Sequence, residues 1–260
     1  MGTRGLIGYY SKGVTKATYN HFDSYPSCLG EDVRAYLSER TPRELYEDFQ
    51  GIRLINEDDE ITPEDVIKYS GVWYGNVGKA FLNGELGDQG WYALLRENQG
   101  DFDAYAEIGL MIDGISFIKD SLFCEWAYII NLDRGVLEVY KGFQTKKPKK
   151  NRYAMTKDEI AVVKAEKGWY HSDMSGKRTH HKNQYYNCDL IAQIPIEDVP
   201  NFDMSMFGEI VGDAESDSDY RVGKIILDTQ FGTEAIRSTI QSKVLTVTGM
   251  VTLGDIGVEA

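Results

Sequence analysis

The sequence contains few of the residues that most often reveal a chemistry. Its 260 residues include three cysteines, four histidines and six prolines. Cys28, Cys124 and Cys188 have no paired spacing, and an odd cysteine count without a secretion leader is typical of reduced thiols. We therefore expect a cytoplasmic protein, in the host cytoplasm if the chain is viral.

Motifs of high specificity are missing as well. The stretches GVWYGNVG and NGELGDQG lack the Gly-Lys-Ser/Thr of a phosphate loop. His171, His180, His181 and Cys188 have spacings that fit no zinc pattern, and their Lys-rich surroundings are typical of a surface loop. We expect no cofactor and no metal ion, and the sequence leaves open whether the protein is an enzyme.

Long apolar runs are also absent from the sequence. No stretch reaches the roughly 18 apolar residues that span a membrane, so we expect no membrane association. The formal net charge of -13 disfavours non-specific attraction to nucleic acid, and we expect no specific nucleic-acid ligand. A protein partner or a small-molecule ligand remains as the expected binding class, and a homo-oligomer is left open.

What the sequence does contain is a strong pattern of hairpins. RGLIGYYSKGVTKATYN predicts two strands around residues 11–13, where glycine supplies the positive φ of the turn. If the turn is centred on its middle residue, Thr3 lies opposite His21 and Arg4 lies opposite Asn20. A second hairpin is predicted in SLFCEWAYIINLDRGVLEVYKGF, with its turn at residues 133–135.

Helical patterns separate the two hairpins. Helices are predicted over residues 31–37, 41–51, 62–70, 88–99, 101–112 and 233–242, and further strands over 185–196, 224–229 and 243–253. Local hairpins together with a block of helices indicate an α+β fold, with antiparallel hairpins in one or two stacked sheets and flanking helices. We expect a main domain over residues 1–200 and a C-terminal extension over 201–260.

A basic insertion over residues 144–184 is expected to interrupt the main domain. Residues 141–188 hold 12 Lys and Arg against 4 Asp and Glu, whereas the remainder holds 28 - 12 = 16 against 41 - 4 = 37. The core of this part, KKPKKNR at 146–152, is interpreted as an exposed loop or as a contact for an acidic partner.

The stretch YNHFDSYPSCLG at residues 19–30 is the first candidate site. If it is extended, Tyr19, His21 and Asp23 share one face, so that the carboxylate can orient the imidazole of a general base. Asn20 and Arg4 lie within reach, Arg4 as a partner for an anion. The alternative is structural: Asp23 caps a turn before a helix.

The second candidate is Glu125, the single charge in an otherwise apolar strand. A buried carboxylate must find a cation, accept hydrogen bonds or keep its proton. Glu125 is therefore either an acid or substrate anchor in a pocket with His21, or a buried ion pair with Arg4 or Arg96. Its neighbour Cys124 is expected to be a packed thiol.

Three stretches resemble a family of uncharacterised intracellular and phage-type proteins: MGTRGLIG…YNHFDSYPSCLG, LFCEWAYIINLDRGVLEVYKGF and YYNCDLIAQIPIEDVP. The resemblance covers about half of residues 1–200 and implies a single-domain core without an assigned activity. A more distant similarity to N-terminal-nucleophile hydrolases implies an αββα sandwich. That mechanism would require Thr3 as nucleophile after a further cleavage, because Gly2 has none.

Two classes of function follow from the sequence. The favoured one is an intracellular binding protein, for instance a phage accessory or anti-defence factor. The alternative is a small-molecule amide-type hydrolase that uses His21 as base, Asp23 as its orienter, Glu125 as acid or anchor, and Arg4 with Asn20 around an anion. A virion structural component is a third hypothesis.

Overall fold

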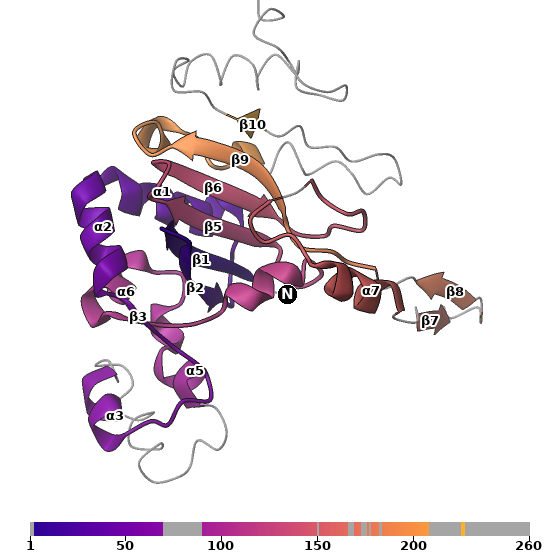
Figure 1. The fold of residues 1–260 in the computed structure, drawn as a ribbon, viewed down its shortest axis with the longest axis horizontal. Coiled ribbons are helices and arrows are strands. Elements are labelled where there is room, and N and C mark those ends of the chain that lie inside the picture. Colours follow the sequence, from indigo (N-terminus) through magenta and orange to yellow (C-terminus); the bar gives the residue numbers. More distant parts are fainter. Residues whose placement is uncertain are drawn as a thin grey trace, which may run out of the picture.

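The computed structural model shows an α+β fold and describes residues 3–69, 90–149, 151–165, 169–172, 176, 178–181, 184–207 and 225–226. Its centre is a six-stranded sheet in the order β10-β9-β6-β5-β1-β2 (Figure 1). The strands of this sheet are β1 (Gly5–Ser11), β2 (Val14–Asn20), β5 (Trp126–Asn131), β6 (Val136–Lys141), β9 (Asp189–Pro195) and β10 (Ile225–Ile226). The predicted α+β class is therefore confirmed.

The sheet is mixed rather than purely antiparallel. The hairpins β1–β2 and β5–β6 are antiparallel, as predicted, but β1 pairs with β5 in parallel. Two further strand pairs lie outside it among the described residues: parallel β3 (Arg53–Ile55) and β4 (Leu110–Ile112), and antiparallel β7 (Trp169–Ser172) and β8 (Arg178–His181). The described strands thus form one large sheet with helices, not two stacked large sheets.

The first hairpin has a register that differs by one residue from the expected one. Gly5 pairs with Asn20 and Ser11 pairs with Val14, so the turn is shared by two residues. Lys12 (φ 48°) and Gly13 (φ 84°) both have positive φ, as a two-residue type I′ turn requires. The expected pairs Thr3–His21 and Arg4–Asn20 are wrong for this reason.

Five of the described helices begin within two residues of their predicted starts, whereas α7 (Lys157–Ala165), in the basic insertion, was not predicted. The other five are α1 (Glu31–Ser38), α2 (Pro42–Gly51), α3 (Pro63–Tyr69), α5 (Gly90–Leu94) and α6 (Phe102–Ile108), with shorter turns at η1 (Pro26–Gly30), η4 (Arg96–Asn98), η5 (Ile115–Lys119) and η6 (Val199–Asn201). Two predictions were too long. The helix expected over 101–112 ends at Ile108, is capped by Gly109 with φ 66°, and continues as β4. The helix expected over 88–99 is described as α5 followed by the short turn η4. None of the helices in the described part of the chain is long and apolar enough to cross a membrane.

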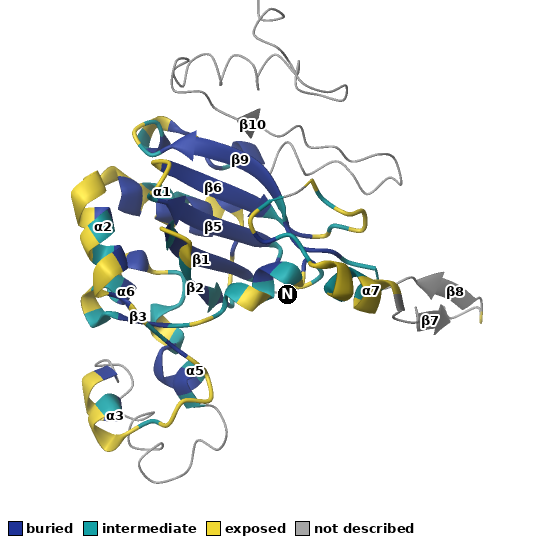
Figure 2. Cartoon of the chain, viewed as in Figure 1, coloured by how far each residue is buried: buried dark blue, intermediate teal, exposed yellow. Residues whose placement is uncertain are grey.

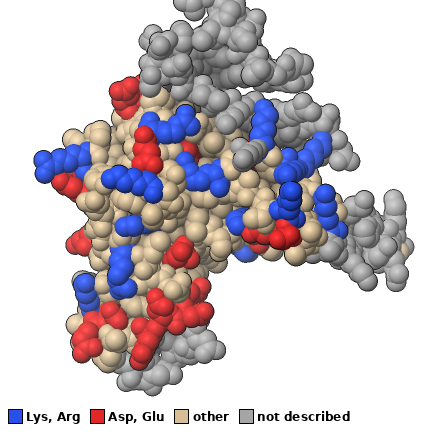
Figure 3. All heavy atoms as spheres, in the orientation of Figure 1, with Lys and Arg blue, Asp and Glu red and all other residues tan. Residues whose placement is uncertain are grey.

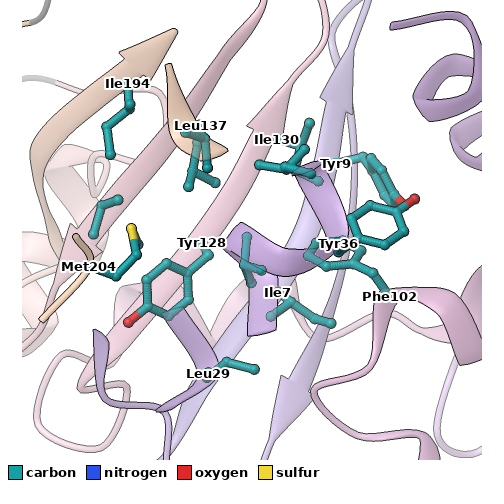
Figure 4. Packing of buried hydrophobic residues seen from close by; sticks show 14 of the residues in the cluster. Ile7, Tyr9, Leu29, Tyr36, Phe102, Tyr128, Ile130, Leu137, Ile194 and Met204 are labelled. Atoms are coloured by element: carbon teal, nitrogen blue, oxygen red, sulfur yellow. The ribbon is translucent and has the colours of Figure 1, made fainter. Parts of the chain in front are cut away.

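Both faces of the sheet are buried (Figure 2). On one face, Tyr9, Tyr128 and Ile130 pack against α1, α2 and α6; the ring of Tyr36 stacks on that of Phe102 at 4.9 Å (Figure 4). On the other face, a smaller cluster of apolar residues lies under η5 and the segment around residue 153. Strands covered on both faces read as nearly continuous apolar runs, which explains the sequence of β5.

The C-terminal and basic parts are described only in places. The segments predicted at 233–242 and 243–253 lie outside the described residues, and of the strand predicted over 224–229 only β10 is described. Within the basic insertion, Lys147 and Lys149 are exposed as expected. The prediction that the whole cluster at 146–152 is exposed is wrong for Arg152. Its guanidinium forms an ion pair with Glu138 in the sheet and is not a free contact for a partner.

Candidate functional site

The end of the first hairpin brings three of the five candidate residues into one row. Gly5 pairs with both Asn20 and Trp126, so one residue further out Arg4 lies between His21 and Glu125. The backbone N–H of Glu125 donates to the carbonyl of Arg4 at 2.9 Å. The strands lie close together at Gly5, since a Cβ on this residue would lie 2.4 Å from the carbonyl oxygen of Trp126. The polar side chains therefore gather at one edge of the sheet.

The imidazole of His21 is held by two tyrosines. Its Nδ1 lies 2.8 Å from the hydroxyl of Tyr19 and 3.3 Å from that of Tyr92. We assign Nδ1 as the acceptor from Tyr19, which places the proton of the neutral ring on Nε2. Partial burial lowers the pKa of His21, and the charges of Arg96 and Arg4 lower it further. His21 is thus a neutral donor at pH 7.

Asp23 does not share the face of His21. The strand ends at Asn20, and Asp23 has φ 45° in the left-handed region. Among the hydrogen bonds of the described residues, none joins Asp23 to His21; the carbonyl of Asp23 accepts from the N–H of Leu29 instead. The expected common face of Tyr19, His21 and Asp23 is wrong for Asp23, and the turn interpretation describes its place better.

Asn20 and Ser24 fix this turn from inside. Asn20 donates from Nδ2 to the hydroxyl of Ser24 at 2.9 Å and also to the carbonyl of Phe22. The backbone N–H of Ser24 donates to the carbonyl of Thr3, and Thr3 itself is only 2 % exposed. The residue that a nucleophile role would require is therefore buried.

Glu125 is half-buried, not fully buried as expected. Desolvation raises the pKa of its carboxyl, and the charges of Lys141 and Arg4 act in the opposite direction. Lys141 lies on the other side of it: its Nζ is 3.9 Å from the centre of the Trp126 ring, and burial lowers the pKa of Lys141 to about 8. Glu125 is thus surrounded by cations without a close ion pair in the described part of the chain.

Exposed aromatic rings flank the row. The guanidinium of Arg4 lies 5.0 Å from the ring centre of Phe123, and that of Arg96 lies 5.4 Å from Phe22. Phe22 and Phe123 are 53 % and 45 % exposed. We call the set Arg4, His21, Phe22, Tyr92, Arg96 and Phe123 the arginine–aromatic surface.

A groove of about 730 Å³ opens next to this surface, between η1, α1 and the segment before α6. Asn20, Phe22, Asp23 and Arg96 line it, and so connect it to the arginine–aromatic surface. Its other charged lining residues are Asp32, Glu39, Glu97, Asp101 and Asp103. Desolvation and the charge of Asp101 raise the pKa of Asp32. No group of three metal-ligating side chains occurs among the described residues.

The fully buried carboxylate of the sheet is Glu138, which sequence reasoning missed. It is 1 % exposed and accepts from both guanidinium nitrogens of Arg152, at 2.8 and 3.0 Å. Its remaining donors are the hydroxyl of Tyr140 (2.8 Å) and the amides of Asn131 (2.8 Å) and Gln193 (3.2 Å). The sequence signal that could have revealed this site is the presence of two amide side chains, Asn131 and Gln193, in otherwise apolar strands.

Two of the three cysteines are packed thiols. Cys124 and Cys188 are buried and Cys28 is exposed, all three without a disulfide. The thiol of Cys188 donates to the carbonyl of Cys124 at 3.2 Å, and burial raises the pKa of Cys124. A thiol with a raised pKa is a poor nucleophile at pH 7.

The arrangement offers two guanidiniums, a neutral imidazole with its N–H on Nε2, and open aromatic rings, which are groups that can bind an anion or an aromatic ligand. Comparisons with protein-family models, with curated proteins and with solved structures find no match to this chain.

Proposed function

We propose that this chain is an intracellular binding protein that holds an acidic segment of a protein partner on the arginine–aromatic surface. The observation that carries the proposal is that both arginines lie on half-exposed phenylalanine rings. Within the described residues, neither Arg4 nor Arg96 has a carboxylate at ion-pair distance. Their charge is available to a ligand.

The charge of the molecule narrows the class of ligand. On a chain of net charge -13, two unpaired guanidiniums at one sheet edge are a local exception. Nucleic acid would meet repulsion from the rest of the molecule. A short acidic peptide contacts only a small part of the molecule, whereas acidic side chains gather on the lobe with α3 (Figure 3).

The shape of the surface also favours a macromolecular partner. Phe22 and Arg96 line the groove, whereas Arg4 and Phe123 line neither of the two hollows described for this chain, so the surface extends beyond the groove. Small-molecule sites are usually concave and bury most of their ligand. Open clusters of arginine and aromatic residues are enriched in the energetic centres of protein interfaces.

The test compares two fluorescein-labelled peptides of equal length, one of Glu and Tyr and one of Lys and Tyr, by fluorescence anisotropy. We expect the Glu/Tyr peptide to bind and the Lys/Tyr peptide not to bind. The double variant Arg4→Gln, Arg96→Gln should weaken binding about tenfold, since it removes two charge-assisted contacts.

The matched control is Arg43→Gln on α2. Arg43 is highly exposed and forms an ion pair with Glu47 one turn away, so this variant removes one positive charge outside the arginine–aromatic surface, whereas the double variant removes two within it. It should keep its affinity within about twofold. Equal affinity of the double variant and the control would contradict the proposal.

A further inference from the structure

The centre of the arginine–aromatic surface is an imidazole between two guanidiniums. On one side, Arg96 donates to the hydroxyl of Tyr92 at 3.0 Å, and this hydroxyl lies 3.3 Å from Nδ1 of His21. On the other side, Arg4 occupies the adjacent strand position. The charges of both arginines lower the pKa of the His21 imidazole, so both guanidiniums lie within electrostatic range of this ring.

No ion pair among the described residues holds the guanidiniums of this centre. The groups that face His21 are the hydroxyls of Tyr19 and Tyr92, the two guanidiniums, the ring of Phe22 at 4.4 Å, and the amide of Gln99, which accepts from the backbone N–H of His21. The carboxylate in the same row, Glu125, lies on the other side of Arg4, and the charge of Arg4 acts on it. Within the described residues, the site thus holds two guanidiniums that have no carboxylate at ion-pair distance.

We propose that the arginine–aromatic surface recognises a phosphate monoester carried by an aromatic ring, that is, a phosphorylated tyrosine in the partner segment. This inference rests on the proposed function. A phosphate monoester carries about -1.5 to -2 charges at pH 7 and three acceptor oxygens, whereas a glutamate carries one charge. Its two guanidinium partners would be Arg4 and Arg96, and the Nε2–H of His21 the third donor.

The aromatic part of the ligand has its own partners. Phe22 contacts the His21 ring edge to face and lies under Arg96, with about half of its surface exposed. A tyrosine ring whose phosphate lies between the arginines can pack on Phe22 or Phe123. Aromatic pairs contribute about 0.5–1.5 kcal/mol beyond area burial, so a phosphoserine should bind less tightly.

The experiment uses four peptides that differ only at the central position: tyrosine, phosphotyrosine, phosphoserine and glutamate. Affinity is measured by isothermal titration calorimetry with the full chain, and adenosine monophosphate is titrated as a free aromatic phosphate. We expect phosphotyrosine to bind at least tenfold tighter than tyrosine and severalfold tighter than phosphoserine. Arg4→Gln with Arg96→Gln should abolish the difference, Arg43→Gln should keep it, and Phe22→Leu should reduce the preference over phosphoserine.

An NMR titration of His21 gives an independent readout. Because a dianion stabilises the imidazolium, the pKa of His21 should rise when the phosphotyrosine peptide is bound. An unchanged His21 titration, or equal binding of phosphotyrosine and glutamate peptides, would overturn the inference and leave the proposed function intact. Equal binding of phosphotyrosine and phosphoserine would overturn its aromatic part. Binding of adenosine monophosphate alone would overturn the peptide source, and no binding of any peptide would overturn both proposals.

Discussion

Glu138 shows how one side chain can connect distant parts of the chain. It lies in β6, whereas Arg152 lies in the irregular segment that follows β6, and Gln193 lies in β9. The Arg152 guanidinium also lies 3.4 Å from the centre of the Tyr10 ring in β1. The ion pair therefore attaches the start of the basic insertion to the sheet.

Removing this carboxylate should destabilise the protein strongly. We expect Glu138→Ala to lower the free energy of unfolding by about 3 kcal/mol, because Arg152 then keeps a largely buried charge without a partner. Urea unfolding followed by circular dichroism measures it. The control Glu47→Ala removes the carboxylate of the exposed Arg43 pair and should cost less than about 0.5 kcal/mol. A cost below about 1 kcal/mol for Glu138→Ala would show that the pair is not structural.

The sequence pattern indicated Glu125, and not Glu138, as the buried carboxylate of the sheet, and this has a physical reason. Glu125 stands among apolar residues, whereas Glu138 alternates with Leu137 and Val139 as an outward residue of a half-exposed strand would. What buries Glu138 is Arg152 and Tyr153, a contact that no local pattern contains. The candidates His21 and Arg4 were accessible from sequence because the strand end is dense in polar residues, but Arg96, Tyr92 and Phe123 come from other segments.

At the level of secondary-structure elements, the sequence predicted where helices start and where chain turns lie better than it predicted which strands pair. Thr41 begins α2 with a capping box: its hydroxyl accepts from the N–H of Glu44, whose carboxylate accepts from the N–H of Thr41. The motif Thr-Pro-x-Glu contains all of this locally. The parallel pairing of β1 with β5 could not be predicted in this way, because it joins segments far apart in the sequence.

The cap of α2 gives a prediction for a single element. Thr41→Ala should lower the free energy of unfolding by about 1 kcal/mol, since a helix N–H loses its acceptor. Urea unfolding checks it, with Ser38→Ala as the control. The Ser38 hydroxyl donates to the carbonyl of Arg34 within α1 and caps no helix start, so its loss should cost much less. Equal costs for the two variants would argue against a capping role.

At the level of the whole molecule, stability should be distributed unevenly. All six residues of β5 are buried and the strand lies between β1 and β6. In contrast, α3 belongs to the lobe with many acidic side chains (Figure 3), and its Ile67 is 76 % exposed. Local opening is easiest where few apolar contacts must be broken.

Hydrogen exchange measured by mass spectrometry tests this distribution. Amides of β5 should exchange slowest and only through global unfolding, while those of α3 should exchange through local opening at least a hundredfold faster. Peptides from α2, which packs on the sheet through Leu45 and Phe49, serve as an internal comparison and should lie between them. Equal protection of β5 and α3 would mean that the molecule opens as one unit.

The parallel contact between β1 and β5 also has a kinetic consequence. Each hairpin can close by itself, but the central contact must wait until Gly5 meets Trp126 across all the helices that lie between them in the chain. Contacts between such remote segments carry a large loop-closure entropy and slow the search for the native state. We therefore expect the docking of one hairpin onto the other to set how fast this protein folds.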